Sequence, residues 1–275
     1  MHNTLSSNKK LGIFAGEGKL PIQVALTAKE QGYEITGFAL SKEIKESLAS
    51  FVHEIYEITP GQIGKNMKLV KESGVKEVVF IGKVPKINLL KNIYKLDWVA
   101  IQELSKLTSF SDDTIQQAVA KLVENNGASI ISQTKFLSKL FPDIGVLTQK
   151  SPSDDEMADI NYGFRIAKEL ARIDIGQTVI VKDLMIVAIE AIEGTDEAIK
   201  RAGNLTHKPI VVVKVARSNH DTRFDVPTVG LNTLKAMNIK NNGGVLAVAA
   251  NETMLIDKEE MVEYADKNNI SIIVI

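Results

Sequence analysis

The sequence predicts an α/β protein with two units, and three observations support this class. Short apolar runs typical of buried strands alternate with amphipathic segments typical of helices from residue 11 to residue 132. The alternation stops over residues 136–152 and then resumes to the end of the chain. The composition is globular, with 44% hydrophobic and 24% charged residues. We therefore expect domains at 1–135 and 153–275, joined by a connection over 136–152.

The first half has the pattern of a parallel sheet with helices on both faces. The apolar run Leu11–Ala15 leads into a loop with Gly16 and Gly18, and Pro21 suits the first turn of the following helix. Further strands are expected at 33–40, 53–59, 77–82 and 128–132, and helices at 21–31, 61–73, 86–95, 97–107 and 112–126. The expected architecture is a Rossmann-like, doubly wound sheet.

The second half predicts another α/β unit, which begins with a long helix over 154–173 capped by Ser153. Strands are expected at 178–182, 185–192, 210–215, 245–250 and 270–275, and helices at 195–203, 230–238 and 258–268. If 186–193 is one strand, Glu190 shares a face with Ile186 and Ala188. Thr195 is then expected to cap the next helix.

Composition excludes several classes of function. A net charge of −1 gives no basic field for nucleic acid, so no nucleic-acid partner is expected. The chain contains no cysteine, which excludes thiolate catalysis and cysteine-bound zinc. No uncharged run approaches the roughly 18 residues of a membrane span. We expect a cytoplasmic protein whose membrane contact, where it occurs, is peripheral.

The loop with Gly16 and Gly18 is a candidate phosphate site, because a helix N-terminus offers free amides to an anion. It lacks the third glycine of the dinucleotide fingerprint, and the second strand has no acid at its tip, which argues against a nicotinamide cofactor. A purely structural tight turn stays open. Gly82 and Lys83 follow the fourth strand at the same edge, where Lys83 is either a solvated charge or a phosphate contact. Asp112 either stabilises a helix start or takes part in the site.

Charged residues gather at the ends of the strands expected in the second half. They are Glu190, Glu193, Asp196, Lys214, Arg217, Asp221, Arg223 and Asp225. Magnesium prefers a few carboxylates together with water and phosphate oxygens, and cations neutralise charge on a transferring phosphoryl group. The set suits hydrolysis of a phosphoanhydride. A capped strand-to-helix junction with solvated charges explains the same residues without a function.

Longer stretches resemble the LpxI-type UDP-2,3-diacylglucosamine pyrophosphatases over nearly the whole chain. They are Leu11-Gly-Ile-Phe-Ala-Gly-Glu-Gly-Lys-Leu-Pro21, Met157-Ala-Asp-Ile160, Asp174-Ile-Gly-Gln177, Glu190-Ala-Ile-Glu-Gly-Thr-Asp196 and Asp221-Thr-Arg-Phe-Asp-Val-Pro-Thr-Val-Gly230. The resemblance implies Mg²⁺-dependent hydrolysis of UDP-2,3-diacylglucosamine to UMP and 2,3-diacylglucosamine 1-phosphate (lipid X), in lipid A synthesis of Gram-negative bacteria. It also implies that water attacks the phosphorus on the sugar side, with the substrate held between the two domains.

The resemblance also implies a role for one residue, Asp225, and the roles of the other residues are our own inference. Asp225 matches the essential aspartate of an Asp-x-Pro-Thr motif, so we expect it to bind the metal or orient water, with Glu190 as a second metal ligand. The expected catalytic residues are Asp225, Glu193, Asp196 and Lys214. The expected substrate contacts are Gly16, Gly18, Gly82, Asp112, Thr195, Arg223 and Thr228. Lys83 departs from the asparagine expected in the family, so no role is assigned to it.

The expected partners follow from that substrate. They are UDP-2,3-diacylglucosamine and, transiently, the surface of the inner membrane, while a homodimer is left open. Phe136, Leu137, Leu140 and Phe141 in the connection either border the acyl chains or pack the domains together. Two other functions stay open, an NAD-linked oxidoreductase and a protein that binds the nucleotide or lipid-sugar without turnover.

Overall fold

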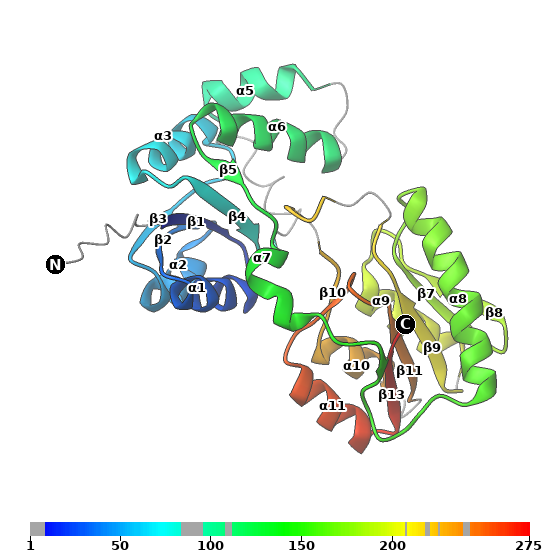
Figure 1. Cartoon of the computed structure of the whole chain (residues 1–275). Helices are drawn as coiled ribbons and strands as arrows, with labels where there is room; N and C mark the ends of the chain where they lie inside the picture. The colour runs from blue at the N-terminus through cyan, green and yellow to red at the C-terminus, as the bar shows by residue number, and fades with distance from the viewer. Residues whose placement is uncertain are drawn as a thin grey trace. The chain divides into compact units, whose positions relative to one another are not determined.

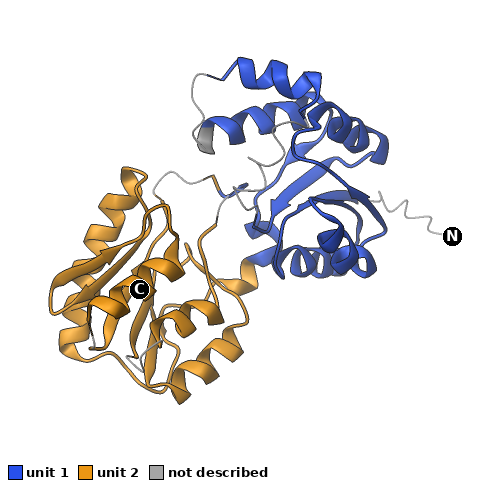
Figure 2. Ribbon diagram, turned by 180° about the vertical axis from the view of Figure 1, so that it is seen from behind, with its two compact units in different colours: residues 1–137, 222–224 blue, residues 138–221, 225–275 orange. Residues whose placement is uncertain are grey.

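The chain forms two compact α/β units in a computed structural model that describes residues 9–83, 96–107, 112–206, 208–217, 221–224, 226–238 and 243–275. Unit 1 comprises residues 1–137 and 222–224, and unit 2 comprises 138–221 and 225–275 (Figure 2). The α/β class is thereby confirmed for both halves. The return of 222–224 to unit 1 is a feature that the sequence analysis did not contain.

Unit 1 is built on a five-stranded parallel sheet in the order β3-β2-β1-β4-β5 (Figure 1). The strands are β1 (Lys9–Ala15), β2 (Tyr33–Ala39), β3 (Glu54–Glu57), β4 (Glu77–Ile81) and β5 (Ser129–Ile130). This strand order is that of a doubly wound, Rossmann-like sheet, which confirms the predicted fold of the first half. The continuous apolar runs in β1 and β2 are explained by helices on both faces.

The helices of unit 1 follow the predicted pattern with two additions. They are α1 (Leu20–Glu30), α2 (Lys42–Leu48), α3 (Ile63–Ser73), α5 (Trp98–Ser105), α6 (Asp112–Asn125) and the short α7 (Thr134–Leu137). The sequence analysis missed the four-residue α7 and also α2, a short and mostly polar helix whose cap is Ser41. The helix expected at 86–95 lies outside the described residues. In the core, the Phe14 ring stacks on Phe38 and Phe80 with centroids 4.9 and 4.4 Å apart.

Unit 2 is built on a six-stranded mixed sheet in the order β6-β13-β11-β9-β7-β8. The strands are β6 (Gly145–Val146), β7 (Thr178–Lys182), β8 (Met185–Ile189), β9 (Ile210–Lys214), β11 (Gly244–Val248) and β13 (Ile270–Val274). The three central strands β9, β11 and β13 are parallel, and β7 runs antiparallel to both β8 and β9. Two short strands, β10 (Thr228–Val229) and β12 (Met254–Leu255), form a separate parallel pair.

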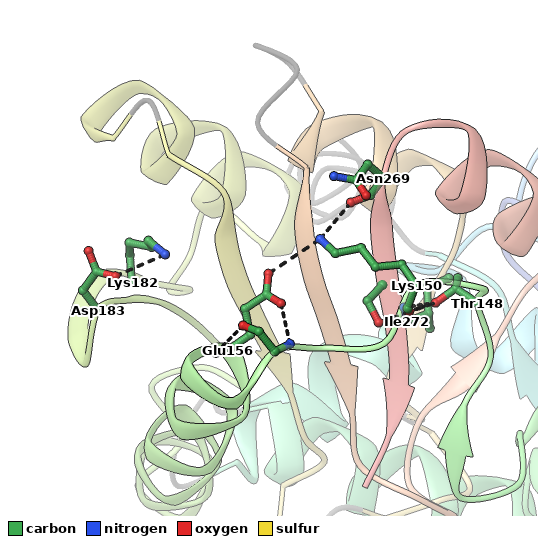
Figure 3. A network of polar contacts seen from close by, with 9 residues as sticks. Thr148, Lys150, Glu156, Lys182, Asp183, Asn269 and Ile272 are labelled. Carbon is green, nitrogen blue, oxygen red and sulfur yellow. Dashed lines mark hydrogen bonds and ion pairs between the residues drawn. The ribbon is translucent and has the colours of Figure 1, made fainter.

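Helices cover both faces of this sheet. The long helix α8 (Asp154–Arg172) packs on one face, and α9 (Thr195–Leu205), α10 (Leu231–Met237) and α11 (Lys258–Lys267) pack on the other. Ser153 starts α8 through a capping box with Glu156, as the sequence predicts. Figure 3 shows this helix start, where Lys150 lies 3.7 Å from Glu156 and donates a hydrogen bond to the Asn269 carbonyl. Among the described helices, none is both long and apolar enough to cross a membrane.

A bulge in the hairpin of β7 and β8 changes which residues share a face. Ile180 pairs with Ala188, but the next residue, Val181, pairs with Ile186, so Val187 is the extra residue of β8. Ile186 consequently packs on the α8 side of the sheet, whereas Ala188 lies in the core on the α9 side. The expectation that Ile186 and Ala188 share one face was therefore wrong.

Candidate active site

Three strand ends meet at one edge of the unit 2 sheet. Lys214 is the last residue of β9 and pairs with Thr178, the first residue of β7. Glu190 directly follows β8, and its backbone N–H donates to the Thr178 carbonyl at 2.9 Å. The residues two positions further into these strands belong to the core under α9. Since side chains alternate along a strand, Thr178, Glu190 and Lys214 all face the α9 side.

A buried polar cluster of Glu190, Thr195 and Lys214 fills this edge. The Lys214 ammonium donates to Thr195 Oγ1 at 2.8 Å, and the Thr195 hydroxyl donates to Glu190 Oε1, also at 2.8 Å. Lys214 is only 5% exposed and Glu190 9% exposed. Buried charges are tolerated when hydrogen bonds compensate the loss of water. The threonine hydroxyl contributes to this compensation for both charges, because it accepts from the cation and donates to the carboxylate.

Glu190 keeps one carboxylate oxygen available. Its Oε2 atom is buried and accepts no hydrogen bond from any described residue. A buried carboxylate oxygen without a partner suits a divalent cation or a donor group of a ligand. This oxygen therefore fits the predicted role of Glu190 as a magnesium ligand. Within the described ranges no three acidic or histidine residues form a metal-binding group, and Asp225, the other predicted ligand, lies outside these ranges.

Glu193 supports the loop that follows β8. It lies 2.5 Å from the Arg201 guanidinium, and its other oxygen accepts from the Ala191 N–H at 3.2 Å. The same guanidinium donates to the Ile189 carbonyl at 2.8 Å. The Arg201 hydrogen bond lowers the pKa of Glu193 below its usual value. The described contacts of Glu193 therefore brace residues 190–194, while the predicted catalytic role stays a prediction.

The start of α9 differs from the expectation in one respect. Gly194, with φ of 84°, is the N-cap, and Thr195 is the first helical residue. A left-handed φ favours glycine, and it turns the chain so that the Thr195 side chain enters the polar cluster instead of capping the helix. Asp196 accepts a hydrogen bond from the Thr233 hydroxyl at 3.0 Å, which ties α9 to α10.

The glycines predicted to contact substrate lie in unit 1, where two loops approach closely. The backbones of Glu17 and Lys83 exchange hydrogen bonds of 2.8 and 2.9 Å. A Cβ atom at Gly16 would lie 2.5 Å from the Lys83 carbonyl oxygen, and one at Gly82 would lie 2.7 Å from the Gly16 carbonyl carbon. This packing explains Gly16 and Gly82 structurally. Gly18, by contrast, has open space around it and a φ of 106°.

The segment 222–224 is held on unit 1 by Gln133, a buried residue that the sequence analysis missed. The Gln133 amide donates to the carbonyls of Phe80 and Phe224 at 2.8 and 3.0 Å, and its backbone N–H donates to the Thr222 carbonyl. The Phe224 ring packs on Phe80 with centroids 5.4 Å apart. These contacts fix the chain immediately before Asp225.

The remaining predicted substrate residues lie in three places. Arg223 belongs to unit 1, where its guanidinium is 3.9 Å from a Glu124 carboxylate oxygen. Thr228 lies in β10 of unit 2 and pairs with Met254. Asp112 is the first residue of α6, and its side chain is outside the described part of the structure. Their substrate roles stay predictions.

Asp159 is, after Gln133, a second buried polar residue that the sequence analysis missed, and its contacts support the fold. Its carboxylate is 2% exposed and accepts from the backbone N–H groups of Asp183 and Leu184 at 3.1 and 2.6 Å. Both donor N–H groups lie in the turn between β7 and β8, where Asp183 and Leu184 have left-handed φ angles. An acid next to the apolar Ile160 within the predicted 154–173 helix was the available indication.

The fold and the cluster define a two-domain α/β protein in which a Rossmann-like unit precedes a second sheet with a buried lysine, threonine and glutamate at its strand ends. Proteins of this class commonly bind ligands at such strand ends. The chain belongs to the LpxI family. The family model of the LpxI N-terminal domain matches residues 10–140, and that of the LpxI C-terminal domain matches residues 143–273.

A curated relative covers almost the full chain. The UDP-2,3-diacylglucosamine pyrophosphatase LpxI of Caulobacter vibrioides is 26% identical over 269 residues, which are 94% of each protein. Solved structures match less well. The ADP complex of an N5-carboxyaminoimidazole ribonucleotide synthetase gives a TM-score of 0.29 at 14% identity, covering 72% of this chain and 45% of that one. The biotin carboxylase domain of Hydrogenobacter thermophilus 2-oxoglutarate carboxylase gives 0.29 at 15% identity, covering 72% and 41%. This chain thus spans less than half of either structure.

Proposed function

We propose that this chain hydrolyses UDP-2,3-diacylglucosamine to UMP and 2,3-diacylglucosamine 1-phosphate (lipid X), with Mg²⁺ as cofactor. The observation that supports this most directly is the buried polar cluster at a sheet edge of a chain that belongs to the LpxI family. The relative from Caulobacter vibrioides carries the name of this activity. The reaction is cleavage of a phosphoanhydride, in lipid A synthesis of Gram-negative bacteria.

Lys214 is the residue best suited to neutralise the diphosphate. Its ammonium is buried, so its attraction for a phosphate oxygen is weakened less by water than that of a surface lysine. Thr195 fixes the direction of the ammonium, and Glu190 fixes the Thr195 hydroxyl. The cluster is therefore preorganised, and no large side-chain rearrangement is needed when charge develops on the leaving phosphate.

The proposed magnesium ligands are Glu190 and Asp225. Glu190 contributes the buried Oε2 oxygen, which has no donor among the described residues. When bound, the ion supplies positive charge for the phosphate oxygens and lowers the pKa of a coordinated water. Thr195 occupies only Oε1 of Glu190, so holding Lys214 and holding the ion do not compete for one atom.

The bond changes follow from the products. A water oxygen bonds to the phosphorus next to the sugar, and the bond from that phosphorus to the bridging oxygen breaks. The bridging oxygen leaves with UMP, and the water oxygen stays in the lipid phosphate. We place this reaction in the cytoplasm, with transient contact with the inner membrane, because the substrate combines UDP with two acyl chains.

Incubation in ¹⁸O-labelled water with UDP-2,3-diacylglucosamine and Mg²⁺ tests the proposal by mass spectrometry of both products. We expect the label in 2,3-diacylglucosamine 1-phosphate, loss of UMP release on chelation, and loss of turnover in Lys214→Met and Asp225→Ala. Label in UMP would contradict the point of attack. Thermal stabilisation by the substrate without UMP release, under every divalent metal tried, would instead indicate binding without turnover, and tight NADH binding would indicate the oxidoreductase.

A further inference from the structure

Three exposed isoleucines lie at the same edge of the unit 2 sheet as the polar cluster. Ile173 is 52% exposed, Ile175 is 48% exposed and Ile192 is fully exposed. Isoleucine is among the residue types most often buried, and isolated exposed cases need no explanation, but a group beside a polar site does. We refer to Ile173, Ile175 and Ile192 as the isoleucine rim.

The two loops of the rim are neighbours that border the cluster. Gly176 packs so closely against the backbone of Glu190 that a Cβ atom at position 176 would collide with the Glu190 carbonyl oxygen. The next residue, Gln177, accepts a hydrogen bond from the Val215 N–H, directly after Lys214. Ile192 lies between Glu190 and the start of α9. Both loops therefore surround the strand ends that carry Glu190 and Lys214.

Neighbouring residues brace both loops, so the isoleucines are held in exposed positions. Asp174 has a left-handed φ of 59° and lies 2.9 Å from the Arg217 guanidinium. The loop of Ile192 is braced by the contacts of Arg201 with Glu193 and with the Ile189 carbonyl. The polar residues beside the rim are thus engaged with one another, and the apolar side chains are the groups presented to a partner.

We propose that the isoleucine rim docks on the acyl layer of the lipid surface that carries the substrate. This rests on the proposed function, in which a diphosphate must reach the polar cluster while two acyl chains stay in an apolar phase. Insertion of the isoleucine rim among acyl chains removes apolar surface from water and is therefore favourable. Because the rim lies beside the polar cluster, the same docking brings the diphosphate close to that cluster. The flanking cations Arg201 and Arg217 are in ion pairs. Docking is therefore driven by apolar contact and depends little on anionic lipid or salt.

The test compares the full-length triple variant Ile173→Ser/Ile175→Ser/Ile192→Ser with wild type and with Leu205→Ser. Leu205 is 67% exposed and ends α9, whereas the rim lies at the start of that helix, so it is a matched apolar control. Flotation measures binding to vesicles of phosphatidylethanolamine and phosphatidylglycerol. Steady-state kinetics compare long-chain UDP-2,3-diacylglucosamine in mixed micelles with a water-soluble analogue that carries short acyl groups.

We expect the triple variant to lose vesicle binding and roughly tenfold in kcat/KM on the micellar substrate, with unchanged activity on the soluble analogue. Leu205→Ser should behave as wild type. Unchanged vesicle binding in the triple variant overturns the proposal, and so does an equal loss on both substrates by a folded variant. If the triple variant is unstable, the same measurements are made on the single variant Ile192→Ser. The Ile192 side chain is fully exposed, so its replacement does not disturb the core. Failure of the proposed function is distinct, because wild type would then cleave neither substrate.

Discussion

Thr195→Val removes the hydroxyl that serves both buried charges of the polar cluster and changes the side-chain volume little. Thr195 makes two charge-assisted hydrogen bonds of 2.8 Å, one from the Lys214 ammonium and one to the Glu190 carboxylate. Hydrogen bonds to charged groups contribute about 1.5 to 3 kcal/mol each. Thr195 itself is only half-buried, so water replaces part of what is lost. We expect unit 2 to be destabilised by about 3 kcal/mol in its free energy of unfolding.

The matched control is Thr195→Ser, which keeps the hydroxyl and removes one methyl group, worth about 1 kcal/mol. The assay must report on unit 2 itself, because two-unit chains need not unfold in one step. The single tryptophan, Trp98, lies in unit 1, so its fluorescence is unsuitable. Amide hydrogen exchange of β7, β9 and α9 measures the relevant opening free energy. Equal protection in the valine and serine variants would refute the view that the hydroxyl compensates both charges.

Three further predictions concern contacts around the site. Asp159→Ala leaves two backbone N–H groups of the β7–β8 turn without their acceptor and should destabilise unit 2 by about 2 to 4 kcal/mol, which a thermal shift and faster amide exchange in that turn would show. Gln133→Leu removes two side-chain hydrogen bonds and should raise amide exchange in 222–224 without altering protection of β9. Unchanged exchange in 222–224 would contradict the anchoring role. Arg201→Gln removes the cause of the lowered pKa of Glu193. The ion pair is fully formed above the ordinary pKa of 4.5 and is lost as pH falls through the lowered value. Wild type and variant should therefore differ in protection of 190–194 at neutral pH and converge in acid, as exchange measured from pH 7 downward would show.

The sequence was sufficient for most of the fold, because burial on both faces leaves a continuous apolar run in a parallel strand. Strand β1 is such a run. The cap of α8 at Ser153 is another local pattern that the sequence shows. The bulge at Val187 was not predictable, since nothing in residues 186–193 distinguishes a regular strand from one with an extra residue. That extra residue decides which side chains share the face of Glu190.

The residue types of the polar cluster were predictable from the sequence, but their arrangement was not. Acids, hydroxyls and cations near strand ends indicated oxygen chemistry. Glu190, Thr195 and Lys214, one of each kind, do meet. The position of Thr195 between the two charges depends on the turn at Gly194, which the sequence suggested only as a tight turn. The anchoring of 222–224 by Gln133 joins residues about ninety positions apart, and no local pattern encodes such a contact.

The membership of residues 222–224 in unit 1 bears on how the protein is made. A ribosome synthesises the first 137 residues long before Phe224, so the side of the Phe80 ring that Phe224 covers stays uncovered while more than half of unit 2 is translated. Strands β11 and β13 emerge later still. Neither unit can then be finished before the other has begun, and a chain released early would expose unfilled apolar surface on its amino-terminal half.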